Sequence, residues 1–385
     1  MGESQIVRLG SGDFEEGMKF LNFVFGEHSP HDFEKLLPTI YRATDEHMAH
    51  NYAIREEGEI QAVVGLFPIT WRVGDATLRV AGIGGVSTHP ESRGQGLMQR
   101  LMKHCVGTMR DEGFHLSWLG GQRQRYLYFG YEKCGNSITA NVNRSNIRHC
   151  FDGEPGLRMQ PMGKGDGDLL RRAKVLHDRQ AMHCERPLED FWRHCAAWYH
   201  EGWAALDAGD EMVGYLVAPR EGGYVSELVA ESAEAAERMV RTWSRERGEK
   251  GIALELNPLA SETNCRFAAC CEQISLHSSG NWQIFAWAEV VDALMKAKQA
   301  AGPLPEGSVV VDIEAYGAIA LSVADGEAGC TRSTAEAQVT VDPATCMRLL
   351  FGPLQASQVM PLSPEGALLD MWCPLPLYWA RQDGV

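Results

Sequence analysis

The feature that most constrains this chain is a β-type run that passes through a glycine-rich turn into an amphipathic helix, at residues 82–98. Gly94 and Gly96 lack a Cβ, so the backbone can turn tightly and a ligand can approach it closely. The first N–H groups of the following helix have no partner within the helix and carry the positive end of its dipole. A diphosphate fits such a site, with Arg93 as a fixed positive charge. The stretch therefore predicts a pyrophosphate-binding turn.

The segment after this turn has apolar residues at helical spacing. They form one face of the expected helix: Leu97, Met98, Leu101, Met102, Cys105, Val106 and Met109. This period predicts an amphipathic helix, and Gly113 is placed to end it. The turn thus lies between a strand and a helix, as a phosphate site requires. An ordinary glycine turn before a surface helix is the alternative, because glycine-rich turns alone are weak evidence.

Length and composition set the scale of the molecule. With 385 residues the chain is too long for one typical domain, so two or three are expected. A hydrophobic share of 44% and ten tryptophans can build sizeable cores. The eleven cysteines are scattered without a Cys-x-x-Cys pair, which indicates reduced thiols in a cytoplasmic protein.

The charge of the chain bears on its partners. A formal net charge of −15 disfavours nucleic acid or an anionic membrane surface and favours a cationic substrate. No apolar run is long enough to span a bilayer, and the first residues show no signal-peptide pattern. We therefore expect neither a nucleic-acid nor a membrane partner.

The first segment alternates short elements around glycine turns and predicts a mixed α/β domain that ends near residue 150. We expect a helix at residues 14–25 and strands at residues 6–9, 52–55, 60–67, 71–73, 78–86 and 114–119. The Gly- and Pro-rich stretch at residues 152–168 is expected to connect this domain to the next.

The middle segment repeats part of this pattern. A hairpin is expected at residues 203–217, then a strand at 224–229 and a helix at 232–247 with Ser232 as its N-cap. No basic glycine turn lies between this strand and this helix. A second copy of the first domain would therefore lack the phosphate site.

From about residue 283 the character of the sequence changes again. Strand-like runs occur at residues 309–312, 318–323 and 337–341, and a helix is expected at 343–350 after Asp342. This order is consistent with a small α+β domain.

Two motifs of the first segment resemble those of a known family. Val-Ser-Thr-His-Pro at residues 86–90, followed by Arg-Gly-Gln-Gly-Leu-Met at 93–98, is similar to the coenzyme A loop of the GNAT N-acetyltransferases. Tyr-Leu-Tyr-Phe-Gly-Tyr at 126–131 resembles the segment after the fifth strand in the Eis-like (enhanced intracellular survival) branch. The resemblance covers nearly the whole chain, although Met98 stands where many GNAT proteins have Gly or Ala.

The resemblance implies a mixed α/β fold with tandem GNAT domains and a C-terminal sterol-carrier-protein-2-like α+β domain. We accordingly predict a catalytic GNAT domain at residues 1–150, a degenerate GNAT-like domain at 151–285 and the sterol-carrier-protein-2-like domain at 286–385. Glu-Leu-Val at residues 227–229 and Val-Thr-Val-Asp-Pro at 339–343 resemble parts of the latter two. The resemblance also implies a homo-oligomer, a hexamer of two trimers.

The resemblance implies acetyl-CoA as co-substrate and transfer of the acetyl group through a tetrahedral intermediate. Backbone N–H groups on the strand at residues 86–88 suit an oxyanion hole for the thioester carbonyl. The leaving thiolate needs a proton, and the motif match assigns Tyr126 as general acid; a packed aromatic is the alternative. The implied cofactor-binding residues are Val86, Ser87, Thr88, Arg93, Gly94, Gln95, Gly96, Leu97, Met98 and Gln122.

The implied base is the chain's own terminal carboxylate, at Val385. Eis-like enzymes usually end in an aromatic residue, whereas this chain ends in Arg-Gln-Asp-Gly-Val at residues 381–385. A terminal carboxyl group has an ordinary pKa of about 3.5, so it acts weakly or through water unless its site raises that value. The alternative is that residues 380–385 are a frayed tail.

Two functions follow from these observations. The first is an acetyl-CoA-dependent N-acetyltransferase that acts on a cationic small-molecule amine, amino-sugar or polyamine-like, or on lysine. The second is a non-catalytic module that binds acyl-CoA or lipid. The intact turn and Tyr126 favour the enzyme. Histidines and cysteines gather at residues 177–200 without a standard zinc spacing, so no metal is predicted.

Overall fold

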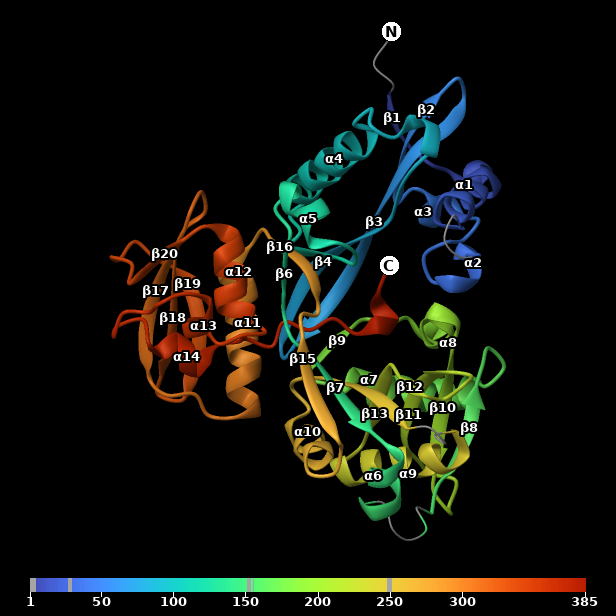
Figure 1. The fold of residues 1–385 in the computed structure, drawn as a ribbon, viewed down its shortest axis with the longest axis vertical. Helices are drawn as coiled ribbons and strands as arrows, with labels where there is room; N and C mark the ends of the chain where they lie inside the picture. The colour runs from blue at the N-terminus through green and yellow to red at the C-terminus, as the bar shows by residue number, and fades with distance from the viewer. Residues whose placement is uncertain (1–4, 27–29, 151–153, 155, 248–250) are drawn as a thin grey trace.

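The computed structural model describes residues 5–26, 30–150, 154, 156–247 and 251–385 (Figure 1). Within these residues the strands form one eight-stranded sheet and three four-stranded sheets. The eight-stranded sheet occupies the upper part of Figure 1, two smaller sheets lie below it, and the third lies to the left. None of the described helices combines the length and the apolar character needed to cross a bilayer.

The large sheet has the order β1-β2-β3-β4-β5-β16-β6, and β9 pairs with β3. Its strands are β1 (Ile6–Arg8), β2 (Asn51–Glu56), β3 (Glu59–Val73), β4 (Ala76–Thr88), β5 (Leu116–Leu119), β6 (Glu132–Cys134), β9 (Met182–Cys184) and β16 (Gly280–Ile284). Helix α4 (Leu97–Asp111) packs on one face of this sheet, through the predicted apolar stripe. Helix α1 (Phe14–Gly26), α2 (Phe33–Leu36) and α3 (Asp45–Met48) pack on the other face.

Strand β3 is continuous where the sequence predicted two strands, at residues 60–67 and 71–73. Pro68 falls in the gap between these predictions. There β3 has β4 on one side only, because β2 pairs no further than Gly65 and β9 begins to pair at Trp71. A proline is tolerated in a strand where its missing N–H faces no neighbouring strand.

The middle of the chain folds into two four-stranded sheets, β13-β11-β10-β8 and β12-β14-β7-β15. Their strands are β7 (Ser137–Val142), β8 (Arg158–Met162), β10 (His200–Leu206), β11 (Met212–Pro219), β12 (Tyr224–Val225), β13 (Glu227–Ala230), β14 (Ile252–Leu256) and β15 (Gln273–His277). The accompanying helices are α6 (Arg144–Cys150), α7 (Gly167–Asp178), α8 (Leu188–Ala196), α9 (Ala233–Arg247) and α10 (Ser261–Ala268).

This middle region repeats the strand topology of the large sheet. Strand β13 is antiparallel to β11 and β12 is parallel to β14, as β4 is antiparallel to β3 and parallel to β5. The predicted strand at residues 224–229 is thus divided at Ser226 into one part for each sheet. The mixed α/β fold with a second GNAT-like arrangement agrees with the predicted fold class.

The last part of the chain forms the fourth sheet, β19-β18-β17-β20, against α11 (Trp287–Ala301). Its other elements are β17 (Gly307–Ile313), β18 (Gly317–Ala324), β19 (Glu327–Arg332), β20 (Val339–Val341), α12 (Pro343–Phe351), α13 (Ala356–Val359) and α14 (Leu368–Trp372). Helix α12 begins after Asp342, whose carboxylate accepts hydrogen bonds from the N–H groups of Ala344 and Thr345. The chain then runs back to the centre of the molecule, where it ends (Figure 1).

Two strands do not follow the predicted divisions at residues 150 and 285. Strand β7 precedes residue 150 but belongs to a sheet of the middle region, and β16 precedes residue 285 but returns to the large sheet between β5 and β6. Composition and turn signals follow the chain and do not record such an exchange of strands. The predicted domain boundaries, and the sterol-carrier-protein-2-like character of the last part, stay predictions.

Candidate active site

The site begins where two neighbouring strands of the large sheet separate. Strand β5 pairs with β4 only at residues 80–83, whereas β4 continues to Thr88. Among the described strands, none pairs with β4 beyond residue 83 on the side away from β3. The register of β3 and β4 shifts between Val63 and Gly65, and Gly85 has a φ of +60° at this bulge. The end of β4 therefore presents backbone groups to an opening in the sheet.

The predicted oxyanion residues lie along this opening. Ser87 is buried, and its hydroxyl donates a hydrogen bond to the carbonyl of Gly85 at 3.0 Å, which closes the bulge. Val86 and Thr88 are half-buried. Because the Ser87 hydroxyl is already bound within the bulge, this stretch offers its backbone to a ligand.

The predicted phosphate turn follows β4 directly and ends at α4. Gly94 and Gly96 both have a left-handed φ, of +84° and +78°, and Gly96 caps the helix without a side-chain hydrogen bond. A Cβ at either glycine would meet no atom of the described residues within 4 Å, which leaves space above them. The first turn of α4 carries no acidic residue. These residues fit a pyrophosphate at the start of α4, with the exposed Arg93 and Gln95 beside it.

Leu97 and Met98 serve the helix itself. Leu97 is buried in the cluster under α4 and Met98 packs against that cluster. Their side chains hold the turn against the sheet, so any contact with a cofactor is left to their backbone N–H groups.

Tyr126 is the tyrosine of its segment that lies inward at the separated strands. It ends the short helix α5 (Arg123–Tyr126), is 6% exposed, and shares an apolar cluster with Ile83 of β4 and Leu97 of α4. Its ring packs over Gly121, where a Cβ would lie 3.0 Å from the ring. Burial raises the pKa of the Tyr126 hydroxyl, so this group keeps its proton at neutral pH.

The neighbouring aromatic residues have other environments. Tyr131 is fully buried and its hydroxyl lies 2.7 Å from that of Ser117, in the core. Tyr128 is 89% exposed. Gln122, predicted to line the cofactor, is exposed at the start of α5.

The last residue of the chain lies against β4. A Cβ at Gly84 would stand 2.7 Å from the carboxyl carbon of Val385, and one at Gly82 would stand 2.7 Å from its Cγ2. Val385 also packs against the cluster that holds Phe67 and Tyr41. The carboxyl group of Val385 therefore lies beside the point where β4 and β5 separate, on the face opposite α4.

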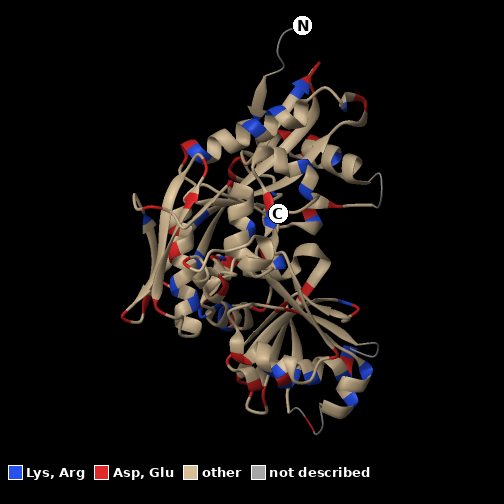
Figure 2. Cartoon of the chain, turned by 60° about the vertical axis from the view of Figure 1, so that its left-hand side comes forward, with Lys and Arg blue, Asp and Glu red and all other residues tan. Residues whose placement is uncertain are grey.

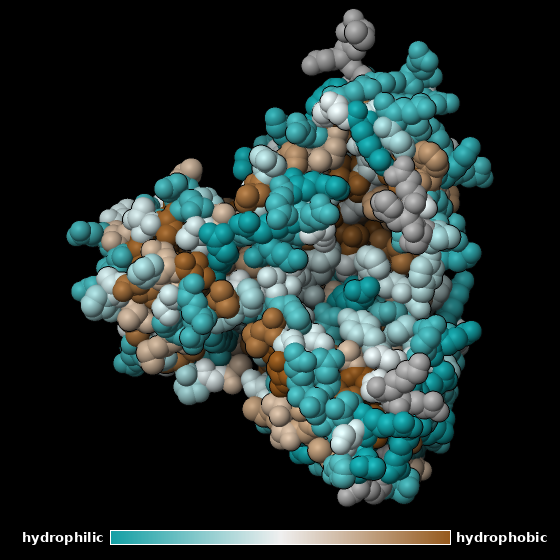
Figure 3. Space-filling model, in the orientation of Figure 1, coloured by the Kyte–Doolittle hydropathy of each residue, from teal (hydrophilic) through white to brown (hydrophobic). Residues whose placement is uncertain are grey.

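A cleft of about 1220 Å³ opens at this carboxyl group, between the large sheet and helices α7 and α8 of the middle region. Figure 3 shows the surface hollowed at this level, with apolar side chains inside the hollow. The lining includes Phe67 and Ile69 from β3, Arg42 from the loop before α3, and Asp190 and His194 from α8. The cleft is thus built by segments that lie far apart in the sequence.

Acidic side chains outnumber basic ones in this cleft. The acidic residues are Glu46, Asp75, Asp178, Glu185, Glu189, Asp190 and Asp383, and the basic residues are Arg42, Arg72, Lys174, Arg179 and Arg186. Ion pairs cancel charges of both signs, as between Arg42 and Asp190 at 2.8 Å, Arg72 and Glu185, and Lys174 and Asp178, so the acidic excess of the lining (seven against five) remains. The cleft consequently favours a cation.

The sequence did not predict the charged residues that line the cleft. They come from loops and helix ends in three parts of the chain, so no regular spacing in the sequence marks them. In the view of Figure 2, acidic and basic residues alternate over much of the molecule, so charge alone does not single out the cleft. Of the histidines at residues 177–200, His177 lies 2.9 Å from the Cys184 carbonyl and its ring contacts that of His183, with 5.2 Å between the ring centroids. The described residues contain no group of three or more metal-binding side chains arranged for an ion.

Comparison with known proteins relates the first part of the chain to an acetyltransferase family and the whole fold to solved structures. Residues 5–134 match the acetyltransferase (GNAT) domain. The fold of the chain is similar to that of a GCN5-related N-acetyltransferase from Kribbella flavida, with 19% identity, a TM-score of 0.68, and coverage of 96% of this chain and 95% of that one. It is also similar to Eis1 from Mycobacterium abscessus, with 14% identity, a TM-score of 0.68, and coverage of 99% and 100%.

A third similar structure is a probable N-acyltransferase from Enterococcus faecalis V583, with 15% identity, a TM-score of 0.68, and 98% of each chain covered. No curated protein matched the sequence. At these identities the structures establish a shared fold over nearly the whole chain, while the domain match identifies residues 5–134 as an acetyltransferase domain.

Proposed function

We propose that this GNAT acyltransferase moves an acetyl group from acetyl-CoA to the amine of a cationic small molecule, amino-sugar or polyamine-like, or of a lysine. The observation that carries the proposal is the position of the Val385 carboxyl group, which lies on β4 between the cofactor turn and an acid-rich cleft. GNAT-fold enzymes use acyl-CoA, and we propose acetyl-CoA as the acyl donor of this one.

The cofactor would be held by the end of β4 and the start of α4. Backbone groups at residues 86–88 lie along the opening of the sheet, where they suit the thioester end, and the turn at residues 93–98 suits the pyrophosphate. Gln122, exposed at the start of α5, would also line the cofactor. The bound thioester would supply the electrophilic carbonyl, and these backbone donors would stabilise the negative charge that develops on its oxygen.

Tyr126 and Val385 would handle the two protons of the transfer. The Val385 carboxylate takes the proton that the attacking amine loses, directly or through a water molecule. Tyr126, which burial keeps protonated, gives a proton to the departing thiolate. The two groups lie on opposite faces of β4, because Tyr126 packs in the cluster under α4 and Val385 in the cluster of α1 and α2.

The cleft would hold the acceptor. Its excess of carboxylates attracts a cation, and its apolar floor at Phe67 and Ile69 lies next to the Val385 carboxyl group. An acceptor with several amines could place one at the carboxylate while others contact the acidic rim.

We also propose a domain division, a cellular compartment and an oligomeric state. We assign the catalytic domain to residues 1–150, a degenerate GNAT-like domain to 151–285 and a sterol-carrier-protein-2-like domain to 286–385. We place the enzyme in the cytoplasm, in keeping with eleven free cysteines, and expect a hexamer that light scattering would test.

A thiol-release assay with acetyl-CoA and a panel of amines tests the proposed function. We expect turnover with di- and polyamines or amino-sugars, and little with neutral or anionic amines. No release with any acceptor, despite measurable acetyl-CoA binding, would contradict the enzyme and leave a non-catalytic acyl-CoA-binding module.

A further inference from the structure

The two residues that precede the last glycine and valine of the chain are polar and buried. Gln382 is 1% exposed and Asp383 is 5% exposed. Burial of such groups costs free energy unless every polar atom finds a partner. Their partners therefore show what holds the tail in the cleft.

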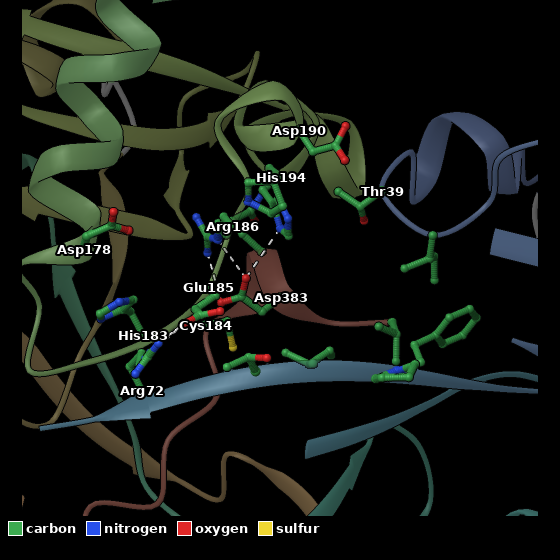
Figure 4. A pocket seen from close by; sticks show the side chains of 18 of the residues that line it. Thr39, Arg72, Asp178, His183, Cys184, Glu185, Arg186, Asp190, His194 and Asp383 are labelled. Carbon is green, nitrogen blue, oxygen red and sulfur yellow. Dashed lines mark hydrogen bonds and ion pairs between the residues drawn. The ribbon is translucent and has the colours of Figure 1, made fainter. Parts of the chain in front are cut away.

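Arg186 is the central partner of Asp383. Its guanidinium donates from Nε and Nη2 to the two carboxylate oxygens of Asp383, at 2.8 and 3.0 Å. It also donates from Nη1 and Nη2 to the two oxygens of Glu227, at 2.8 and 2.6 Å. The Arg186 side chain has no solvent exposure. Figure 4 shows Asp383 between Arg186 and His194, at the wall of the cleft.

Gln382 is held by the middle region from two sides. Its Nε2 donates to the carbonyl of His194 at 2.8 Å. Its Oε1 accepts from the hydroxyl of Ser226 at 2.9 Å. Ser226 is the residue at which β12 and β13 diverge, the counterpart of the opening between β4 and β5. The chain's own tail thus binds at the divided strand of the second GNAT-like arrangement.

This arrangement fixes position more than it adds stability. Buried ion pairs recover little beyond their desolvation cost, and apolar residues of similar volume often stabilise a fold as well or better. Two bidentate contacts, in contrast, define both the place and the orientation of a carboxylate. From Asp383 to the last residue the chain spans at most about 7 Å. The Arg186 contacts therefore confine the Val385 carboxyl group to its place on β4.

We propose that Arg186, Glu227 and Ser226 form a positioning device that the middle region provides for the catalytic carboxylate of Val385. The device acts on the tail through Asp383 and Gln382. This inference rests on the proposed function, in which that carboxylate is the base. The second GNAT-like arrangement would then serve the first one by holding the base, without binding a coenzyme of its own.

The test uses Asp383→Asn and Gln382→Ala in the full chain, with intact mass confirming Val385 as the final residue. Asp383→Asn keeps the shape of the side chain and leaves the Arg186–Glu227 pair in place. We expect carboxypeptidase to release the terminal valine at least tenfold faster from each variant. We expect kcat to fall about tenfold while KM for acetyl-CoA stays within twofold, because the cofactor turn is untouched.

Val240→Ala is the matched control for lost stability. Val240 is fully buried in α9, in an apolar cluster that contains no residue of the tail. This variant should lower the melting temperature yet leave valine release and kcat unchanged. If it lowers kcat as much as Asp383→Asn does, the effect follows from general destabilisation and the positioning role is wrong.

A protein extended by one glycine after Val385 separates this inference from the proposed base. If the extension abolishes turnover while Asp383→Asn and Gln382→Ala keep full kcat, the base stands and the positioning device is wrong. If the extended protein keeps full activity, the base itself is wrong, and the inference fails with it. Loss of kcat in Asp383→Asn without faster valine release would also overturn positioning.

Discussion

The two strand-to-helix connections of the GNAT-like arrangements differ in how they treat the start of the helix. Between β4 and α4 the chain uses residues 89–96. The N-cap of this helix is Gly96, which has no side chain to accept a hydrogen bond. Between β13 and α9 it uses only Glu231 and Ser232. The Ser232 hydroxyl accepts a hydrogen bond from the N–H of Ala235 at 3.1 Å, and Glu234 adds a negative charge to the first turn. One helix start is left for an anion and the other is satisfied by its own residues.

The openings beside these connections differ in the same sense. At β4 and β5 the opening is bordered by the glycine turn and Tyr126, whereas at β12 and β14 the divided strand binds Gln382. The same topology can therefore serve a ligand or a segment of its own chain. What decides between these roles is the loop before the helix, because it fixes whether the first N–H groups are available.

The largest expected effect concerns the first opening, in the variant Tyr126→Phe. Loss of a general acid should lower kcat about 100- to 1,000-fold, or about 3–4 kcal/mol, and leave KM for acetyl-CoA nearly unchanged. Steady-state kinetics with a good amine acceptor measures both. The exposed Tyr128, changed to Phe, is the control and should behave as wild type. An unchanged kcat would remove Tyr126 from the mechanism.

Acid should destabilise the fold mainly through buried histidines of the middle region, near the second opening. Burial lowers the pKa of His177 and of His200 to about 4, and His200 contacts both Ser226 and Gln382. As the pH is lowered from 7 to 5, these two histidines bind protons in the unfolded chain but stay neutral in the folded one. The free energy of unfolding therefore decreases as the pH is lowered. The expected loss is roughly 1–2 kcal/mol for each histidine at pH 5.

The carboxylates of the second opening respond at lower pH. Arg186 holds the pKa values of Asp383 and Glu227 below their ordinary range, so their contribution is lost only in stronger acid. Urea unfolding at pH 7 and pH 5 measures the histidine effect. The exposed His149, changed to Gln, should leave it unaltered. Equal stability at the two pH values would show that the histidines are not buried as described.

A smaller effect is expected for Gly96→Ala at the start of α4. A Cβ is strained at the φ of +78°, so the turn should shift and KM for acetyl-CoA should rise about tenfold, with a lesser change in kcat. Gly107→Ala is the matched control: Gly107 lies inside the same helix, and a Cβ there would meet no atom within 4 Å. Alanine at that position should stabilise the helix slightly and leave KM unchanged. Similar KM values for both variants would argue against a cofactor at the turn.

The smallest effect is expected for Ser232→Ala at the start of α9. Loss of the cap should lower the free energy of unfolding by about 1 kcal/mol. Acetyl-CoA binding should not change, because this helix start is already satisfied within the chain. Calorimetric titration measures the number of acetyl-CoA molecules bound, which we expect to be one per chain. A second site in wild type that Ser232→Ala alters would break the comparison.

Local patterns predicted the elements that carry their own signals. The apolar stripe after Gly96 predicted α4, and Ser232 and Asp342 marked the starts of α9 and α12. The hairpin expected at residues 203–217 corresponds to β10 and β11. Each of these signals acts within a few residues, so the sequence displays it directly. The glycine turn was predicted from its local pattern too, whereas Tyr126 was singled out by the family resemblance, and the functional roles of both stay predictions.

Contacts between distant segments left no such signal. Arg42 forms an ion pair with Asp190 across the cleft, and Arg186 forms one with Asp383, although the two members of each pair are far apart in the sequence. Val385 rests on Gly84 because of where the tail returns, and no spacing records that return. The exchange of β7 and β16 between sheets was missed for the same reason. The acid-rich cleft and the support of the tail therefore required the structure.

The place of β16 has a consequence for the order of synthesis. Among the described strands, β5 and β6 are joined only through β16, which the ribosome makes more than a hundred residues later. A nascent chain that has just delivered the acetyltransferase domain therefore exposes two unpaired strand edges, which invite association with other chains. The sheet closes only after residue 284 has emerged. The domain that is translated first is thus among the last to be finished.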